Sequence, residues 1–82
     1  MPPEELWQKL RAQPFEPFRL FLTDGTAYDI RHPELMMVGR RAAVIGIAHS
    51  EQPMPFFEHT ATVALLHIVR LEPMETRHVP GN

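Results

Sequence analysis

The fold is decided by residues 18–31, which read FRLFLTDGTAYDIR. The first part of this segment is rich in residues that favour extended structure. The Asp24-Gly25 dipeptide that follows is typical of tight turns. After the turn, apolar and polar residues alternate, so Tyr28 and Ile30 point to one face of a strand and the polar side chains to the other. The segment therefore predicts a β-hairpin whose second strand has one apolar and one polar face.

The segment before the hairpin predicts a short α-helix from about residue 3 to residue 13. Pro3 suits the first helical turn because its missing N–H would be unpaired there, and Pro14 ends the helix because it disfavours helical geometry in the preceding residue. Such a short helix is unstable alone in water, so its apolar stripe must dock on the rest of the chain. That stripe consists of Leu6, Trp7 and Leu10. The aromatic side chains expected mostly in the core are Trp7, Phe15, Phe18 and Phe21.

Apolar runs separated by turn-forming residues predict further strands after the hairpin. Pro33 cannot donate a hydrogen bond to a neighbouring strand, so the strand ends or bulges there and the apolar run resumes at 35–38. Gly39-Arg40 is typical of a second turn. Residues 42–48, AAVIGIA, form a short run whose β-branched members favour a central strand.

The rest of the chain predicts a loop, two strands and a tail. Residues 49–59 contain two prolines and no clear period, which indicates a loop. The next segment is long enough for a helix, but its β-branched residues lower helix propensity. We therefore predict a strand at 60–63, a single helical turn at 64–67 and a last strand at 68–72. Residues 74–82 are polar and are expected to form a flexible tail.

Together these elements predict one domain that spans residues 1–73. The domain is mainly β with an N-terminal α-helix. Its order, a helix followed by about five short strands, resembles a small SH3-like or Sm-like fold, which is a bent sheet or a partly open barrel.

Composition and length limit the kind of protein. The chain has 82 residues, of which 44% are hydrophobic and 22% charged, and this balance is typical of a folded globular domain. It has no cysteine, which excludes a disulfide, a thiolate metal site and a cysteine nucleophile. The net charge of −2 gives no general attraction for nucleic acid. The acidic start lacks the pattern of a signal peptide and no segment is apolar enough to span a membrane, so we expect a cytoplasmic protein.

The first hairpin is similar to that of Sm-like proteins. The matching residues are FLTDGTAY at 21–28. The loop that carries an Asp and an Asn for base and ribose contacts in Sm-like proteins is replaced here by HPELMM at 32–37. The resemblance therefore implies a fold, and uridine binding of the Sm type is not carried over to these residues.

A second resemblance covers nearly the whole chain. A set of small bacterial proteins, common in planctomycetes, begins with a helix and continues PFxPFxLxLxDG, followed by a strand that ends in HPE. The chain has the matching PFEPFRLFLTDG at 14–25, YDIRHPE at 28–34 and a closing LHIVRLE at 66–72. This resemblance implies one domain and a shared fold, and it adds no chemistry.

Several arginines and one tyrosine are candidates for a nucleic-acid site. A basic patch with an aromatic ring suits single-stranded nucleic acid, because phosphates pair with the cations and a base stacks on the ring. Acidic residues interleave with these arginines, however, and solvated arginines at strand rims explain the same pattern without a ligand. The candidates are Arg19, Tyr28, Arg31, Arg40 and Arg41.

The tripeptide His32-Pro33-Glu34 is a further candidate. A histidine and a carboxylate two residues apart at a strand kink can share one face and exchange a proton. The alternative is structural, with His32 bonding to the backbone where Pro33 interrupts the ladder. No nucleophile accompanies the pair, and His49 and His59 lack the spacing of a metal site. We therefore predict no catalytic residue, no metal and no cofactor.

These observations favour a non-enzymatic binding or assembly module over an enzyme. The strands at 35–38 and 42–48 carry few charges that would block pairing at a sheet edge, so we predict a homo-oligomer formed through these edges. On this hypothesis, Val44→Lys or Ile45→Lys separates the copies. A protein partner is the other expected ligand. The alternative function is an Sm-like RNA-binding regulatory protein, whose affinity for RNA falls with salt.

Overall fold

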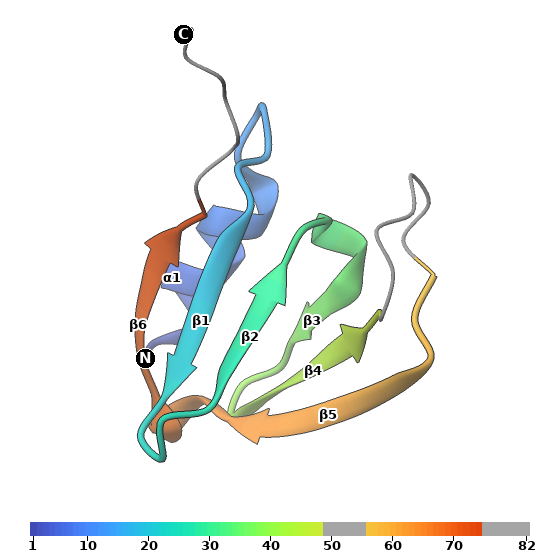
Figure 1. The fold of residues 1–82 in the computed structure, drawn as a ribbon. Helices are drawn as coiled ribbons and strands as arrows, with labels where there is room; N and C mark the ends of the chain where they lie inside the picture. The colour runs from blue at the N-terminus through green and yellow to red at the C-terminus, as the bar shows by residue number, and fades with distance from the viewer. Residues whose placement is uncertain (49–55, 75–82) are drawn as a thin grey trace, which may run out of the picture.

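The computed structural model describes residues 1–48 and 56–74 of the chain (Figure 1). The domain is mainly β with one N-terminal helix, as the sequence predicted. Two single turns of 3₁₀ helix, η1 and η2, interrupt the strands. The elements in chain order are α1 (Pro3–Arg11), β1 (Phe18–Leu22), β2 (Ala27–Ile30), η1 (Pro33–Leu35), β3 (Met36–Val38), β4 (Ala42–Ile47), β5 (His59–Ala64), η2 (Leu65–His67) and β6 (Ile68–Pro73).

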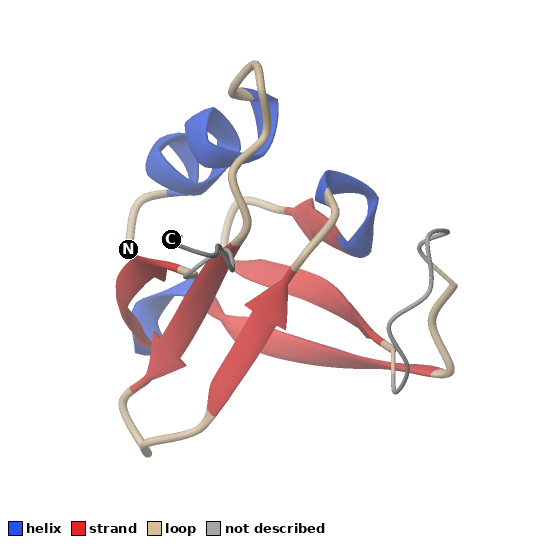
Figure 2. Ribbon diagram, turned by 45° about the horizontal axis from the view of Figure 1, so that its top comes forward, coloured by secondary structure: helices blue, strands red, loops and turns tan. Residues whose placement is uncertain are grey.

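The six strands form two antiparallel sheets of three strands each. One sheet has the order β2-β1-β6 and the other has the order β3-β4-β5. Across the described residues, the two sheets do not close into a barrel. Helix α1 contacts β3 and lies to one side of both sheets (Figure 2). No helix in the described ranges is long and apolar enough to cross a membrane.

The described chain has six strands, where the sequence predicted about five. The extra strand arises at Pro33: β2 ends at Ile30, Pro33 opens η1 and β3 starts at Met36. Proline fixes its own φ and donates no backbone hydrogen bond, which suits the first position of a helical turn better than a strand. The chain therefore makes two strands in different sheets instead of one bent strand.

The predicted hairpin is confirmed in β1 and β2. Its register places Phe18 opposite Ile30, and both side chains are buried. In the turn, Gly25 has a φ of 90°, which glycine adopts without steric cost. Asp24 Oδ1 accepts a hydrogen bond from the Thr26 N–H at 2.9 Å, and this bond lowers the pKa of the Asp24 carboxyl. The turn is thus held by its own residues.

Helix α1 ends at Arg11, two residues before the predicted end at residue 13. Ala12 is already extended, with φ −62° and ψ 143°. Pro14 disfavours helical backbone angles at Gln13, so the helix ends before that residue. Both acidic residues of the first turn and both basic residues of the last turn suit the helix dipole.

The hydrophobic core is formed by buried residues of both sheets and of one face of α1. Leu6 is fully buried, whereas the neighbouring Trp7 is 51% exposed. The prediction that Trp7 lies in the core is therefore wrong, because a nine-residue helix buries one narrow stripe and Leu6 is the residue turned to the sheets. Phe15 and Phe21 are partly buried. The largest fully buried side chains are Phe18, Leu6, Leu20, Ile30 and Ile45.

The predicted strand, helical turn and strand over 60–72 are confirmed in β5, η2 and β6. The β-branched residues of this segment pack well in strands, and this preference outweighs a length that would allow a helix. The loop predicted at 49–59 falls mostly outside the described residues, and its last residue, His59, already belongs to β5. Of the predicted tail only Met74 is described, and its N–H donates to the Pro17 carbonyl oxygen at 3.1 Å.

Candidate protein-binding edge

The free edges of the two sheets are where this domain can add a strand from another chain. β4 is the central strand that the sequence predicted, since it pairs with β3 on one side and with β5 on the other. The prediction that residues 42–48 also form a free edge is therefore wrong, because β3 and β5 pair with the two sides of β4. Ile45 is 1% exposed, so a lysine there disrupts the core instead of separating two copies.

β3 covers most of the edge predicted at 35–38, and it is a free edge of its sheet. It has only three residues, Met36 to Val38. The N–H of Met36 is already used, because it donates to the Pro33 carbonyl oxygen at the end of η1. Very short edge strands resist strand addition, so β3 offers a partner little backbone pairing.

β5 is the other edge strand of this sheet and is longer, with six residues. Its pairing with β4 fixes the direction of its backbone groups. The Leu65 N–H donates to the Arg41 carbonyl oxygen at 2.9 Å, and the register continues through Ala43 opposite Val63 and on along the strand. Hydrogen-bonded and non-bonded positions alternate in an antiparallel pair. The N–H and C=O groups that point away from β4 therefore belong to Thr60, Thr62 and Ala64.

The chemistry of the β5 edge favours pairing with another strand. From Thr60 to Ala64 it reads TATVA, without a charge or a proline. Lysine, proline and inward-pointing charges are the residues by which proteins usually block such an edge. Among the described residues no strand pairs with this side of β5, which runs along the margin of the molecule (Figure 1). The residue pattern predicts a strand at 60–63 but not its place at an edge, because strand order depends on pairings between distant segments.

A hollow of about 410 Å³ adjoins the Ala64 end of this edge. It lies between the hairpin turn and η2, and two contacts tie these parts together. The Thr23 N–H donates to the His67 carbonyl oxygen at 2.8 Å, and Thr23 Oγ1 lies 3.3 Å from His67 Nδ1. The hairpin turn and η2, which form two walls of the hollow, are thus held together. The lining residues are Leu22, Thr23, Asp24, Thr26, Tyr28, Thr62, Val63, Ala64 and His67.

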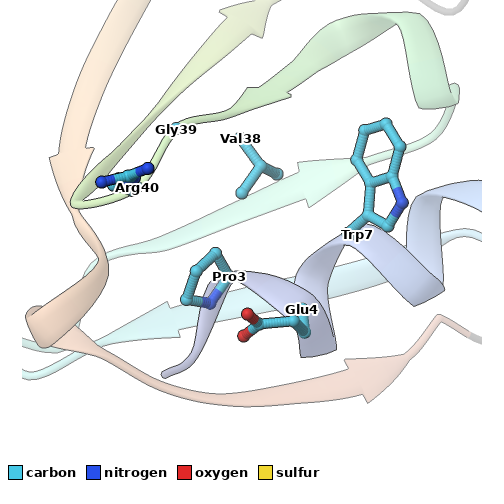
Figure 3. A pocket seen from close by; sticks show the side chains of 6 residues that line it. All are labelled: Pro3, Glu4, Trp7, Val38, Gly39 and Arg40. Carbon is cyan, nitrogen blue, oxygen red and sulfur yellow. The ribbon is translucent and has the colours of Figure 1, made fainter.

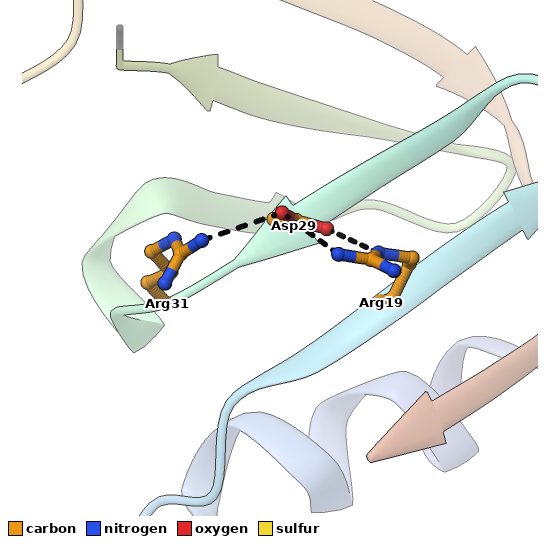
Figure 4. A network of polar contacts seen from close by, with 3 residues as sticks. All are labelled: Arg19, Asp29 and Arg31. Carbon is orange, nitrogen blue, oxygen red and sulfur yellow. Dashed lines mark hydrogen bonds and ion pairs between the residues drawn. The ribbon is translucent and has the colours of Figure 1, made fainter. Parts of the chain in front are cut away.

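Arg19 and Arg31, two of the predicted nucleic-acid residues, converge on one carboxylate (Figure 4). Arg19 Nε lies 2.6 Å from Asp29 Oδ1, and Arg31 Nη2 lies 3.6 Å from Asp29 Oδ2. The hydrogen bond from Arg19 lowers the pKa of Asp29, and the same bond raises the pKa of Arg19. Asp29 therefore neutralises part of the charge that a phosphate would need.

The other three predicted residues lie elsewhere. Tyr28 lines the hollow beside β5, and strand alternation turns its side chain to the face of β2 opposite Asp29. Arg40 and Arg41 are exposed in the turn between β3 and β4, on the other sheet. The structure thus brings together only one pair of the five predicted residues, Arg19 and Arg31.

Arg70, which is not among the predicted site residues, extends the charged face of the first sheet. Arg70 Nε lies 2.7 Å from Glu72 Oε2, and its guanidinium carbon lies 3.9 Å from the ring centroid of Phe21. Register places Arg70 opposite Phe21 and Glu72 opposite Arg19. Alternation within the predicted strand at 68–72 put Arg70 and Glu72 on one face, but only the pairing of β1 with β6 shows what they contact.

His32-Pro33-Glu34 forms the entry to η1. The His32 carbonyl oxygen accepts a hydrogen bond from the Leu35 N–H at 3.0 Å, and the His32 side chain makes no capping hydrogen bond. The backbone of this histidine therefore has the structural role, while Pro33 and Glu34 start the turn. His49 lies outside the described residues. No group of three or more potential metal ligands occurs among the residues that are described.

No family model, curated protein or solved structure matches this chain. Its functional interpretation therefore rests on the geometry of the edge, the hollow and the charged face.

Proposed function

We propose that this domain is a non-enzymatic assembly module that self-associates by pairing its β5 edge with the β5 edge of a second copy. The observation that carries the proposal is the segment of the β5 edge from Thr60 to Ala64, which has neither charge nor proline. Its outward N–H and C=O groups offer several hydrogen bonds, and main-chain hydrogen bonds supply affinity when a strand is added to a sheet.

The edge is complementary to itself. In an antiparallel arrangement about a two-fold axis, Thr62 faces Thr62 of the partner subunit and Thr60 faces Ala64 of the partner subunit. By symmetry, Ala64 also faces Thr60 of the partner subunit, which makes three pairs. All three pairs use outward-pointing backbone groups, and no like charges meet. The product is one continuous sheet that runs β3-β4-β5 through both copies. A cytoplasmic location and the likeness to small SH3-like and Sm-like domains belong to the same proposal, the likeness supported by the helix, the hairpin and the 3₁₀ turn before the last strand.

RNA binding remains the alternative function and is a prediction. The convergence of Arg19 and Arg31 on one side of the first sheet favours it, whereas their shared contact with Asp29 and the position of Tyr28 on the opposite face do not. Its signature is an affinity that falls linearly with the logarithm of salt concentration and weakens in Arg40→Glu with Arg41→Glu.

The test of self-association is the molar mass in solution, measured by size-exclusion chromatography with light scattering and recorded at 260 and 280 nm. The 9.5 kDa chain is expected to elute at twice that mass with a protein spectrum. Thr62→Pro removes one outward N–H without touching a bond to β4, and we expect it to elute as a monomer. Thr62→Val is the matched control because it keeps the N–H, and it should stay dimeric.

A second variant keeps the proposal testable if the proline variant does not fold. Thr62 is exposed, so Thr62→Lys keeps the fold but places two like charges opposite each other in the dimer. Circular dichroism confirms that both variants are folded. A wild-type monomer at every concentration, or a folded Thr62→Lys variant with an unchanged dimer mass, contradicts the proposal.

A further inference from the structure

A groove of about 260 Å³ lies between α1 and the end of β3, away from the β5 edge (Figure 3). Helix α1 forms one wall, and the end of β3 with the following turn forms the other. The volume is below the range of roughly 300–1,000 Å³ typical of pockets for drug-sized ligands, so the groove suits a single side chain better than a cofactor. The lining residues are Pro3, Glu4, Trp7, Val38, Gly39 and Arg40.

Trp7 gives the groove its apolar wall. It is 51% exposed, although its neighbour Leu6 is fully buried. The Arg11 guanidinium carbon lies 5.2 Å from the Trp7 ring centroid, so the indole is already supported from its own helix. A supported, half-exposed tryptophan beside a hollow is typical of the anchor residues of protein interfaces.

Val38 supplies the opposite wall and two backbone groups. The Gly39 N–H donates to the Ala42 carbonyl oxygen at 2.8 Å, which makes this a hydrogen-bonded pair. Because such pairs alternate along antiparallel strands, the N–H and C=O of Val38 point away from β4. An extended segment that enters the groove can therefore pair with Val38 while one of its side chains packs on Trp7.

Two unlike charges flank the apolar walls. Glu4 lies on the helix side of the groove and Arg40 on the turn side (Figure 3). Neither residue forms an ion pair with another described residue. The groove is thus complementary to an apolar residue that has an acidic neighbour for Arg40 and a basic neighbour for Glu4.

We propose that this groove binds an extended segment of a partner protein, in which an aliphatic side chain lies between Trp7 and Val38, with an acidic residue two positions away on one side and a basic residue two positions away on the other, so that all three side chains share one face. This site is separate from the self-association edge, because it lies at β3 while β5 is the opposite edge of the same sheet. With one free residue on β3 for backbone pairing, recognition depends mainly on the side chains.

Trp7 is the only tryptophan in the chain, so its fluorescence reports directly on the groove. The probe is a capped pentapeptide with the sequence Glu-Thr-Leu-Thr-Lys, in which both charged side chains share one face with leucine when the chain is extended. We expect a saturable blue shift of the emission as leucine excludes water from the indole. Two control peptides, one with alanine in place of leucine and one with glutamine in place of both charges, are expected to bind more weakly.

Calorimetric titration of variants assigns the contacts. Trp7→Ala should weaken binding of the peptide by about thirtyfold or more, as for a hot-spot residue. Glu4→Gln and Arg40→Gln should each weaken it by roughly two- to fivefold, the range of exposed ion pairs. Lys9→Gln is the matched control, because Lys9 is an exposed charge on the same helix that does not line the groove.

The Thr62→Lys variant separates this proposal from self-association. If the peptide binds the groove, that variant should bind it with wild-type affinity whether or not the domain dimerises. No blue shift up to millimolar peptide, an equal response to all three peptides, or loss of binding in Thr62→Lys overturns the proposal.

Discussion

The two sheets of this domain differ in how they meet their surroundings. On the outer face of β2-β1-β6, cations and carboxylates alternate across the strands, as in Arg19 between Asp29 and Glu72. The outer face of β3-β4-β5 has no such pairs: Met37, which is 68% exposed, lies in one row with Val44 and Thr62. The first sheet thus pairs several of its charged groups within the chain, while the second exposes apolar surface and an edge without charge from Thr60 to Ala64.

The largest expected effect is a loss of folding stability that differs between the inner and the outer face of β4. Ile45→Lys buries a charge in the core and should lower the free energy of unfolding by about 4 kcal/mol or more, which is a large part of the stability of a small domain. Val44→Lys lies next to it on the outer face and should cost much less. Denaturant titration followed by circular dichroism measures both. Equal losses in the two variants would contradict the assignment of faces.

A smaller effect is expected at the hairpin turn of the first sheet. Gly25 has a φ of 90°, so Gly25→Ala should cost about 1–2 kcal/mol of folding free energy by forcing an L-residue into a left-handed conformation. The same variant should keep its dimer mass, because the turn belongs to the self-contained sheet. Thermal unfolding and light scattering on one sample check both statements. A monomeric but stable Gly25→Ala variant would contradict the statement that the first sheet takes no part in self-association.

The smallest effect is the pH dependence of the charged face. The pKa of Asp29 is lowered in the folded protein by its hydrogen bond from Arg19, so the carboxylate stabilises the fold at pH values above its unfolded pKa of about 3.9. That contribution is lost as the pH falls through the lowered pKa. Asp29→Asn should therefore be slightly less stable than the wild type near pH 6, and the difference should shrink below about pH 4. A difference in melting temperature that is constant across this range would show that Asp29 acts by packing alone.

The hairpin could be predicted from sequence because its information is local. The Asp24-Gly25 turn and the alternation that buries Ile30 need no knowledge of the rest of the chain. The same holds for the strand, turn and strand over 60–72, where β-branched residues decide the outcome.

The candidate site could not be predicted because it depends on strand order and docking. Whether β4 or β5 is the edge follows from pairings between distant segments, and so does the contact of Arg70 with Phe21. Sequence also placed Leu6 and Trp7 in one apolar stripe, but only the packing of α1 decides which of them is buried.

Amide hydrogen exchange at β5, measured at low and high protein concentration, tests the central claim most directly. The N–H groups of Ala61 and Val63 point to β4 and should be protected at both concentrations. Those of Thr60, Thr62 and Ala64 point outward and should gain protection as the dimer forms. Fast exchange of these three amides in a sample whose mass is already doubled would place the interface elsewhere and contradict the account.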